Sequence, residues 1–302
     1  MSNKLANIAF LGLGRMGTPM AHNLLKAGYA VKGYDISQER LTQLVSNGGE
    51  ASTSPEDAAR GADLIISMIM NDAILEAVTY GEGGSFHGAA TGTLFTDLST
   101  VSPMASERVA AAAKELGIRY LRAKVAGSIT PAESGTLTIF ASGAKEDYDA
   151  CLDVFKVMGS NIYHVGDAEV AHYLKLVHSI IVGVYAGMLG EALAFGERGG
   201  ADWEQMIDIL KDGPLGSILL DIKAPVFKAR DYLSPPSDIN TAAKDLDLAL
   251  ETAHKMHIPL PMTALVRQLM SAMQANGRGD VDIFAVVDEF ETMAGLPTSI
   301  KR

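Results

Sequence analysis

The chain has 302 residues, of which 48% are hydrophobic and 20% are charged, and this composition excludes a disordered protein. Its formal net charge of -11 argues against nucleic acid or an anionic membrane surface as the main partner, because both attract basic patches. The single cysteine, Cys151, excludes an intramolecular disulfide, and its apolar neighbours predict that it packs in a core. The first residues lack a basic segment followed by a long apolar run, so we expect no signal peptide and a cytoplasmic protein.

In the first half of the chain, short apolar runs typical of buried strands alternate with helix-like stretches. We expect strands at 8–11, 30–34, 64–68, 93–97, 119–125, 136–141 and 162–165. The first two helices are expected at 16–27 and 38–46. Short glycine-bearing connections between such elements predict right-handed β–α–β units and a doubly wound, mainly parallel sheet.

The strand signals stop after Gly166, and helical patterns continue from Val170 onward. Glycine and proline break these patterns at Gly199, 213–214, 234–236, 259–261 and 277–279. We therefore predict an α/β domain over 1–166 and an all-α domain over 167–302, joined by a long interdomain helix at about 170–199.

Two segments of the second domain allow more specific predictions. The apolar run Ile180–Leu189 is too short to cross a bilayer and predicts a buried helix. Its glycines, Gly183, Gly187 and Gly190, allow close helix packing either within the domain or against a partner subunit. The acidic segment Asp280–Glu291 predicts a solvated helix face with an apolar stripe.

A glycine-rich turn, Gly12-Leu13-Gly14-Arg15-Met16-Gly17, follows the first expected strand and opens the first helix. In such a turn the first glycine permits a tight bend, the second lets the backbone approach a pyrophosphate, and the third lets helix and strand pack closely. Asp35 ends the second strand, where a carboxylate accepts hydrogen bonds from the adenosine ribose of NAD. A 2′-phosphate would meet a like charge there, although Arg40 is near. The first domain is therefore expected to be a Rossmann-type domain that prefers NAD to NADP.

Further motifs narrow the chemistry. They are Asp97-Leu98-Ser99-Thr100 with Pro103, Gly135-Thr136-Leu137, Lys175 in the long helix, and Lys244-Asp245-Leu246. In this order and spacing, together with the glycine turn, they make the chain resemble the 3-hydroxyisobutyrate dehydrogenase family, also called the β-hydroxyacid dehydrogenases. The resemblance extends from about Ile8 to Phe290. It implies an NAD-dependent dehydrogenase or reductase of a small 3-hydroxy acid or its semialdehyde, assembled as a homodimer or homotetramer.

The resemblance also implies roles for individual residues. Lys175 would be the general acid/base, and Thr100 would lie against the cofactor. The segment Met68-Ile69-Met70 would lie along the cofactor, with Met70 where the family usually has proline, and Lys244 would reach the cofactor and substrate region. The chemistry supports a base at this point, because hydride leaves a carbinol carbon readily only if the hydroxyl proton is taken at the same time. A lysine does this near neutral pH only if burial or a nearby positive charge lowers its pKa well below about 10.4.

The chain departs from the family at the expected substrate pocket. The family reads DAPVSGG where this chain reads Arg122-Ala123-Lys124-Val125-Ala126-Gly127-Ser128. His178 and Ser179 stand where the family has asparagines. In one interpretation Ala126, Gly127 and Ser128 still line the pocket, Ser128 or Lys124 binds the substrate anion, and Ser179 or His178 takes over the hydrogen bond to the substrate. In the other, the substrate is no ordinary 3-hydroxy acid, or the activity is weak or lost.

Two alternative functions stay open at this point. The first is an imine-reducing relative, against which the retained Lys175 counts because that group generally lacks this lysine. The second is a cofactor-binding protein with little turnover, which only the altered pocket supports. We expect no metal site, because His254 and His257 have no accompanying Asp, Glu or Cys cluster and Pro259 interrupts the helix.

Overall fold

The computed structural model describes residues 5–233 and 237–297, and the chain divides into two compact units, Met1–Lys175 and Leu176–Arg302. This division falls inside helix α9 (Val170–Arg198), whereas the sequence placed the domain boundary at Gly166, after the last strand. The break expected at 234–236 lies outside the described residues. Each unit is described by itself below.

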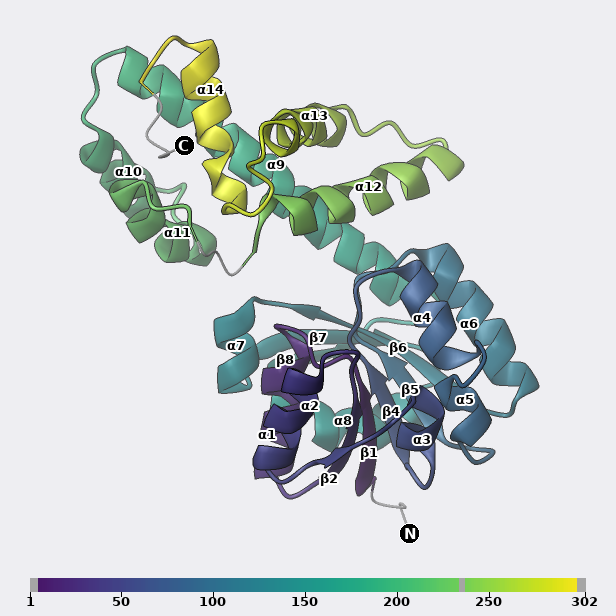
Figure 1. Cartoon of the computed structure of the whole chain (residues 1–302). Helices are drawn as coiled ribbons and strands as arrows, with labels where there is room; N and C mark the ends of the chain where they lie inside the picture. Colours follow the sequence, from purple (N-terminus) through teal and green to yellow (C-terminus); the bar gives the residue numbers. More distant parts are fainter. Residues whose placement is uncertain (1–4, 234–236, 298–302) are drawn as a thin grey trace. The chain divides into compact units, whose positions relative to one another are not determined.

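The first unit is built on one sheet, which has eight strands within the described residues in the order β3-β2-β1-β4-β5-β6-β7-β8 (Figure 1). The strands are β1 (Asn7–Leu11), β2 (Ala30–Tyr34), β3 (Glu50–Ala51), β4 (Leu64–Ser67), β5 (Leu94–Asp97), β6 (Arg119–Ala126), β7 (Leu137–Ser142) and β8 (Gly159–His164). Only β6 and β7 pair in the antiparallel sense. The predicted doubly wound, mainly parallel sheet is confirmed, and only the two-residue β3, which has no apolar run, was not predicted.

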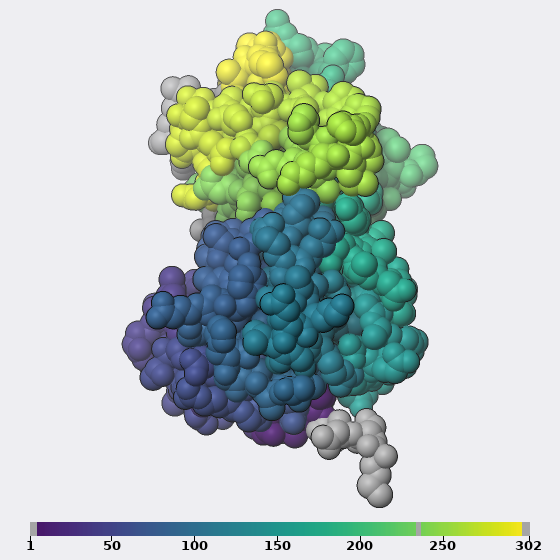
Figure 2. Space-filling model, turned by 90° about the vertical axis from the view of Figure 1, so that its right-hand side faces the viewer, coloured from purple at the N-terminus to yellow at the C-terminus, as the bar shows by residue number. Residues whose placement is uncertain are grey.

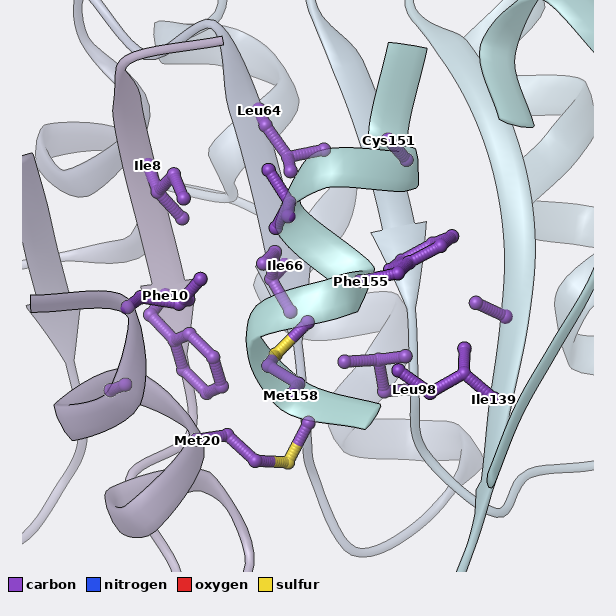
Figure 3. Close-up of a cluster of buried hydrophobic side chains, with 14 of the residues drawn as sticks. Ile8, Phe10, Met20, Leu64, Ile66, Leu98, Ile139, Cys151, Phe155 and Met158 are labelled. Carbon is purple, nitrogen blue, oxygen red and sulfur yellow. The ribbon is translucent and has the colours of Figure 1, made fainter. Parts of the chain in front are cut away.

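Helices cover both faces of this sheet. They are α1 (Gly17–Lys26), α2 (Gln38–Ser46), α3 (Pro55–Ala59), α4 (Asp72–Thr79), α5 (Ser85–Gly88), α6 (Pro103–Glu115), α7 (Ile129–Ser134) and α8 (Lys145–Met158). Successive residues of a strand face opposite sides, so Ile8 and Phe10 pack with α1 and α8 (Figure 3). Ala9 and Leu11 pack with α3–α6, which cover the face of this unit seen in Figure 2 (blue). Both sides of β1 are therefore buried.

Cys151 lies in the first of these cores, beside Phe155 of the same helix (Figure 3). Its side chain is fully buried, and its thiol forms no disulfide. Burial raises the pKa of the thiol, which keeps it protonated and unreactive. The predicted packing role of this residue is confirmed.

The second unit consists of helices around one hydrophobic core. They are the remainder of α9, then α10 (Trp203–Asp212), α11 (Ile218–Ala229), α12 (Ile239–Lys255), α13 (Pro261–Ala275), the 3₁₀ turn Ile283–Val286, and α14 (Val287–Met293). The α9 glycines touch other helices of this unit: a Cβ on Gly183 would lie 3.0 Å from Leu246, one on Gly187 2.6 Å from Val266, and one on Gly190 3.0 Å from the Val287 Cα. Of the two packing alternatives, these glycines serve contacts within the unit.

Helix α9 is less buried than the sequence predicted. Its glycine side packs on α12, α13 and α14, but Ile181 and Met188 on another side are 60% and 53% exposed. By length and composition alone, this helix could cross a membrane. Only 39% of its most apolar stretch is buried within the chain. The prediction of a buried helix is therefore wrong for one side of α9. An apolar helix is buried on every side only if other elements surround it, and here they pack on its glycine side.

The acidic segment 280–291 is not the solvated helix face that the sequence predicted. Asp282, Asp288 and Glu291 are buried. They pair with Lys223, Arg278 and Arg230, respectively. Burial and a hydrogen bond with Asp288 raise the pKa of Glu291 to about 8. The prediction failed because the cations that allow these carboxylates to be buried come from other parts of the unit.

Candidate active site

The predicted cofactor residues of the first unit lie at one edge of the sheet because four parallel strands end in register there. Leu11 at the end of β1 pairs with Tyr34 of β2 and with Ser67 of β4. Ser67 in turn pairs with Asp97 at the end of β5. In doubly wound sheets, ligands bind outside the carboxyl ends of the strands, where the strand order reverses. Here that point lies between β1 and β4, which carry the glycine turn and the Met68–Ile69 segment.

The glycine turn has the geometry of a phosphate cradle. Gly12 has a φ of 93°, and a Cβ there would lie 2.3 Å from the Met68 carbonyl oxygen. A Cβ on Gly17 would lie 2.0 Å from the Gly12 carbonyl oxygen, so helix and strand meet closely. At Gly14 the nearest atom to such a Cβ is the Arg40 Nη1, 3.7 Å away, so the backbone here can be approached. Helix α1 follows with no side-chain cap at Met16. The Thr18 N–H already donates a 3.0 Å hydrogen bond to the Gly14 carbonyl oxygen, so an anion here would be attracted mainly by the positive end of the helix dipole.

Asp35 follows β2 and is almost fully buried against the glycine turn. Its Oδ2 accepts a 2.7 Å hydrogen bond from the Leu13 N–H, and its Oδ1 accepts one of 2.8 Å from the Ser37 N–H. The Arg40 Nη1 is 3.6 Å from Asp35 Oδ2. A carboxylate is thus held at the end of β2, where it fits the ribose hydroxyls of a dinucleotide. The residues of this edge fit a nicotinamide dinucleotide.

Side chains hold the loops after β4 and β5 together. The Ser99 Oγ accepts a 2.9 Å hydrogen bond from the Ile69 N–H. The Asp97 Oδ1 accepts hydrogen bonds from the Ser67 hydroxyl, 2.8 Å, and from the Ser99 N–H, 3.1 Å. Met68 and Thr100 are partly buried within these loops, whereas Met70 is exposed. The two predicted cofactor segments are therefore one connected structure.

Lys175 lies at the end of β6. It is on the first turns of α9, and its Nζ donates a 3.0 Å hydrogen bond to the Val125 carbonyl oxygen. Ala126–Ser128 continue the chain directly from this carbonyl, and Gly127 has a φ of 132°. The Ser128 hydroxyl does not cap α7. The predicted acid/base and the first predicted substrate segment are therefore neighbours.

Lys124 is fully buried, and its Nζ donates to Asp97 Oδ2 at 2.5 Å and to the Asp97 carbonyl oxygen at 3.2 Å. Burial lowers the pKa of Lys124, the negative charge of Asp97 opposes this, and the positive charge of Lys175 adds to the lowering. The Lys124 ammonium is thus engaged by Asp97. A role as partner of the substrate anion would require this pair to break.

Arg122 anchors the residues at the start of α9. Its Nε donates a 2.9 Å hydrogen bond to Glu169 Oε1, and His172 Nδ1 lies 2.9 Å from Glu169 Oε2. Burial opposes the charged form of Glu169, but hydrogen bonding with His172 and the charge of Arg122 outweigh it and lower its pKa to about 2. Burial, with the charge of Lys124, lowers the pKa of His172 to about 4. Because His172 is neutral near pH 7, Arg122 is the cation that neutralises Glu169.

The remaining predicted residues form a group in the second unit. The Ser179 hydroxyl is buried and donates a 3.0 Å hydrogen bond to Asp245 Oδ2. The Lys244 Nζ is 3.1 Å from Asp245 Oδ1 and is partly exposed. His178 is exposed. Asp245 thus orients two of the predicted residues.

The sequence missed some polar residues that organise these groups. Asp97 and Asp245 stand inside the motifs, so a carboxylate there was a usable signal. Glu169 and His172 gave no signal, because Arg122, which pairs with Glu169, and Lys124, whose charge acts on His172, lie on a different element. Among the described residues, no group of three or more His, Cys, Asp or Glu side chains is arranged to hold a metal ion.

Comparisons with known proteins agree with this geometry. Residues 7–166 match the family profile described as the NAD-binding domain of 6-phosphogluconate dehydrogenase. Residues 170–290 match the profile described as the NAD-binding of NADP-dependent 3-hydroxyisobutyrate dehydrogenase. The 2-(hydroxymethyl)glutarate dehydrogenase of Eubacterium barkeri is 34% identical over 98% of each chain.

Solved structures show the same fold. The 3-hydroxyisobutyrate dehydrogenase of Mycobacterium tuberculosis, solved with L-serine, is 25% identical with a TM-score of 0.86, over 94% of this chain and 98% of that one. An imine reductase from Myxococcus stipitatus, solved with NAD⁺, is 18% identical with a TM-score of 0.64, over 95% of this chain and 99% of that one, and this likeness shows the fold alone.

The two profile matches together cover residues 7–166 and 170–290, and the relative has nearly the same length as this chain. The chain is therefore an NAD(P)-dependent oxidoreductase that acts on a small molecule, and it belongs to the 3-hydroxyisobutyrate dehydrogenase family, the β-hydroxyacid dehydrogenases.

Proposed function

We propose that the chain catalyses hydride transfer between NAD and a small 3-hydroxy acid, or its semialdehyde, with Lys175 as the general acid/base. The observation that carries this proposal is the 3.0 Å hydrogen bond from the Lys175 Nζ to the Val125 carbonyl oxygen. It holds the amine next to Ala126–Ser128 and one strand away from Asp97, where the loop with Thr100 begins.

A nicotinamide ring, when bound, accepts the hydride in oxidation and supplies it in reduction. Lys175 acts on the proton: its neutral amine takes the hydroxyl proton of the substrate as the C–H bond of the carbinol carbon breaks. In the reverse direction its ammonium gives a proton to the oxygen of the carbonyl being reduced. The turn Gly12–Met16, Met68, Ile69, Thr100 and Lys244 are proposed to hold the cofactor.

NAD is the proposed cofactor because of Asp35. Its carboxylate is buried and accepts two backbone hydrogen bonds, which hold it beside the expected ribose. A 2′-phosphate would bring a second negative charge to this carboxylate. Arg40, 3.6 Å from Asp35, is a nearby cation that favours NADP. We therefore expect kcat/KM to be higher with NAD, and a higher value with NADP would contradict this assignment.

The proposed substrate contacts are Ala126, Gly127, Ser128, His178 and Ser179. Ser128 is the proposed partner of the carboxylate, because its hydroxyl does not cap α7 and Lys124 is engaged by Asp97. Ser179 is held by its hydrogen bond to Asp245. Loss of one buried hydrogen bond to a charged group costs about 1.5–3 kcal/mol, so the changes from the family pattern alter substrate preference without removing the chemistry.

The decisive experiment is a substitution of Lys175. Purified protein, NAD or NADP, and a panel of 3-hydroxy acids and cyclic imines are followed at the nicotinamide absorbance. We expect turnover of a 3-hydroxy acid, and a loss of about 10²- to 10⁴-fold in kcat for Lys175→Ala, the usual contribution of a general acid/base. Lys114→Ala, an exposed lysine of α6, is the control and should be as active as the parent.

Three outcomes separate the functions considered. A Lys175→Ala variant with parental kcat would overturn the mechanism. Turnover of imines without turnover of hydroxy acids would favour the imine-reducing alternative. Binding of NAD without turnover of any substrate would leave a cofactor-binding protein.

We also propose that the protein is a cytoplasmic homodimer or homotetramer in which α9 forms part of the subunit contact. The exposed side of α9 carries Ile181 and Met188, and Met262 of α13 is exposed as well. Exposed apolar patches of this kind mark contact surfaces. Light scattering after size-exclusion chromatography should give at least twice the mass of one chain, and Ile181→Glu should lower it.

A further inference from the structure

Two basic side chains, Arg122 and Lys124, stand two residues apart on β6, where the family has aspartate and proline. Residues two apart on a strand face the same side of the sheet. Tyr120 faces this side too and packs in the core on the α6 side. Both basic side chains are paired with carboxylates, Arg122 with Glu169 and Lys124 with Asp97. The two pairs hold different parts of the site. Arg122 holds the start of α9 through Glu169, and Lys124 holds the end of β5 through Asp97.

Lys124 joins the ends of three neighbouring strands. Its ammonium donates to the side chain and to the main-chain oxygen of Asp97 at the end of β5. The other oxygen of Asp97 accepts from Ser67 at the end of β4 and from the N–H of Ser99. The Ser99 hydroxyl then accepts from the N–H of Ile69. Lys124 is therefore the charged centre of a buried network that holds both loops proposed to contact the cofactor.

Lys124 is also the neighbour of the proposed acid/base. The Lys175 Nζ is bonded to the carbonyl oxygen of Val125, the residue that follows Lys124. The positive charge of Lys175 acts against the charged form of Lys124, and Coulomb interactions are mutual. The charged or titratable groups around Lys124 are Asp97 on β5, Tyr120 and Arg122 on its own strand, and Glu169, His172 and Lys175 at the start of α9.

We propose that Lys124 is a positioning residue of this active site: through Asp97 it fixes the loop that carries Thr100, and it holds a buried positive charge beside Lys175. This inference rests on the proposed function, in which Lys175 is the acid/base. A cation next to an amine favours the neutral form of that amine, which is the form that takes a proton from a hydroxyl. The lysine that replaces the family's proline thus favours the form of Lys175 that the oxidation needs.

The test measures the titration of Lys175 in the cofactor-free protein, by competitive acetylation over a range of pH with mass spectrometry of the peptides. In the parent we expect Lys175 to titrate well below the exposed Lys114. In Lys124→Met we expect the Lys175 midpoint to rise by about 0.5–1 pH unit. We expect the dissociation constant of NAD, from calorimetry, to rise about 3- to 10-fold because the loop loses a charged hydrogen bond.

The matched control is Lys223→Met. Lys223 is buried in the second unit and forms a Lys–Asp pair of the same 2.5 Å length with Asp282. This variant should lose stability, because it also leaves a buried carboxylate unpaired, but it should keep the parental Lys175 midpoint and NAD affinity. Lys124→Arg retains a cation for Asp97 and should restore most of the parental midpoint.

The outcomes that overturn the proposal are distinct from failure of the proposed function. If Lys124→Met keeps the parental Lys175 midpoint and NAD affinity, Lys124 is only a structural residue. If Lys124→Met does not fold, the titration of Lys175 in the parent protein is the remaining test. A Lys175 that titrates like Lys114 would contradict a buried cation beside Lys175. If Lys175→Ala is fully active, the proposed function fails whatever the acetylation shows.

Discussion

At the scale of single residues, Gly12 and Gly28 show how the same backbone conformation has different causes. Their φ angles are 93° and 88°, both in the left-handed region that favours glycine. A Cβ on Gly28 would meet no atom within 4 Å, whereas one on Gly12 would lie 2.3 Å from the Met68 carbonyl oxygen. Gly28 is therefore needed only for its conformation, and Gly12 also for the close approach of two backbone segments.

This difference predicts the effect of alanine at the two positions. Gly28→Ala should lower the free energy of unfolding by about 1–2 kcal/mol, the usual cost of the left-handed conformation, and should bind NAD like the parent. Gly12→Ala should lose more stability and most of its NAD affinity, because the loops after β1 and β4 must separate. Urea unfolding and calorimetry with NAD measure both quantities, and equal effects of the two substitutions would contradict the assignment.

At the scale of elements, the glycines of α9 determine how closely the helices of the second unit pack. The nearest atoms to a Cβ on Gly183 would be the side-chain methyl carbons of Leu246, at 3.0 Å. One on Gly190 would meet the main chain of Val287, at 3.0 Å from its Cα and 3.1 Å from its nitrogen. A side-chain tip can move by a few tenths of an ångström, but a helix backbone moves only if α14 shifts as a whole.

We therefore expect opposite outcomes for alanine at these two positions. Alanine is a better helix former than glycine by about 1 kcal/mol. Gly183→Ala should leave the unfolding free energy within about 0.5 kcal/mol of the parent or raise it, since Leu246 can adjust. Gly190→Ala should lower it by about 1–3 kcal/mol, the usual cost of overpacking. Thermal and urea unfolding test this, and a Gly190→Ala variant as stable as the parent would show that α14 moves freely.

At the scale of the whole molecule, the buried residues at the start of α9 make stability depend on pH. Burial lowers the pKa of His172 from 6.5 to about 4, so the unfolded chain binds a proton in a range where the folded chain does not. Stability is therefore lost as the pH falls from 6.5 to 4. Glu169, whose folded pKa is about 2 against 4.5, adds a loss as the pH falls below 4.5.

His172→Gln tests this dependence, because glutamine does not titrate. In the parent, the free energy of unfolding should fall between pH 6.5 and pH 4 by about 3 kcal/mol on account of His172. The variant should be less stable at pH 7 but should have a flatter profile in this range. His254→Gln, on the exposed end of α12, is the control and should keep the parental slope. An unchanged slope in His172→Gln would assign the acid sensitivity to other groups.

Much of this protein follows from the sequence alone. Alternating strand and helix patterns predicted the doubly wound sheet, because hydrophobic periodicity reflects which faces must be buried. The glycine turn and the end of the second strand predicted where the tight turn and Asp35 lie, since both are consequences of local backbone geometry. The family motifs predicted Lys175 in the first turns of the long helix, where the structure has it.

Only the tertiary structure decided which charges are buried and with which partners. The pairs Lys124–Asp97, Arg122–Glu169 and Lys223–Asp282 each join residues from separate elements. It also decided that the α9 glycines pack within their own unit and that Asp288 and Glu291 are buried. A charged side chain has the same local pattern on a surface as in an ion pair. Whether it is buried depends on a partner distant in sequence that offsets its desolvation, and periodicity carries no information about that partner.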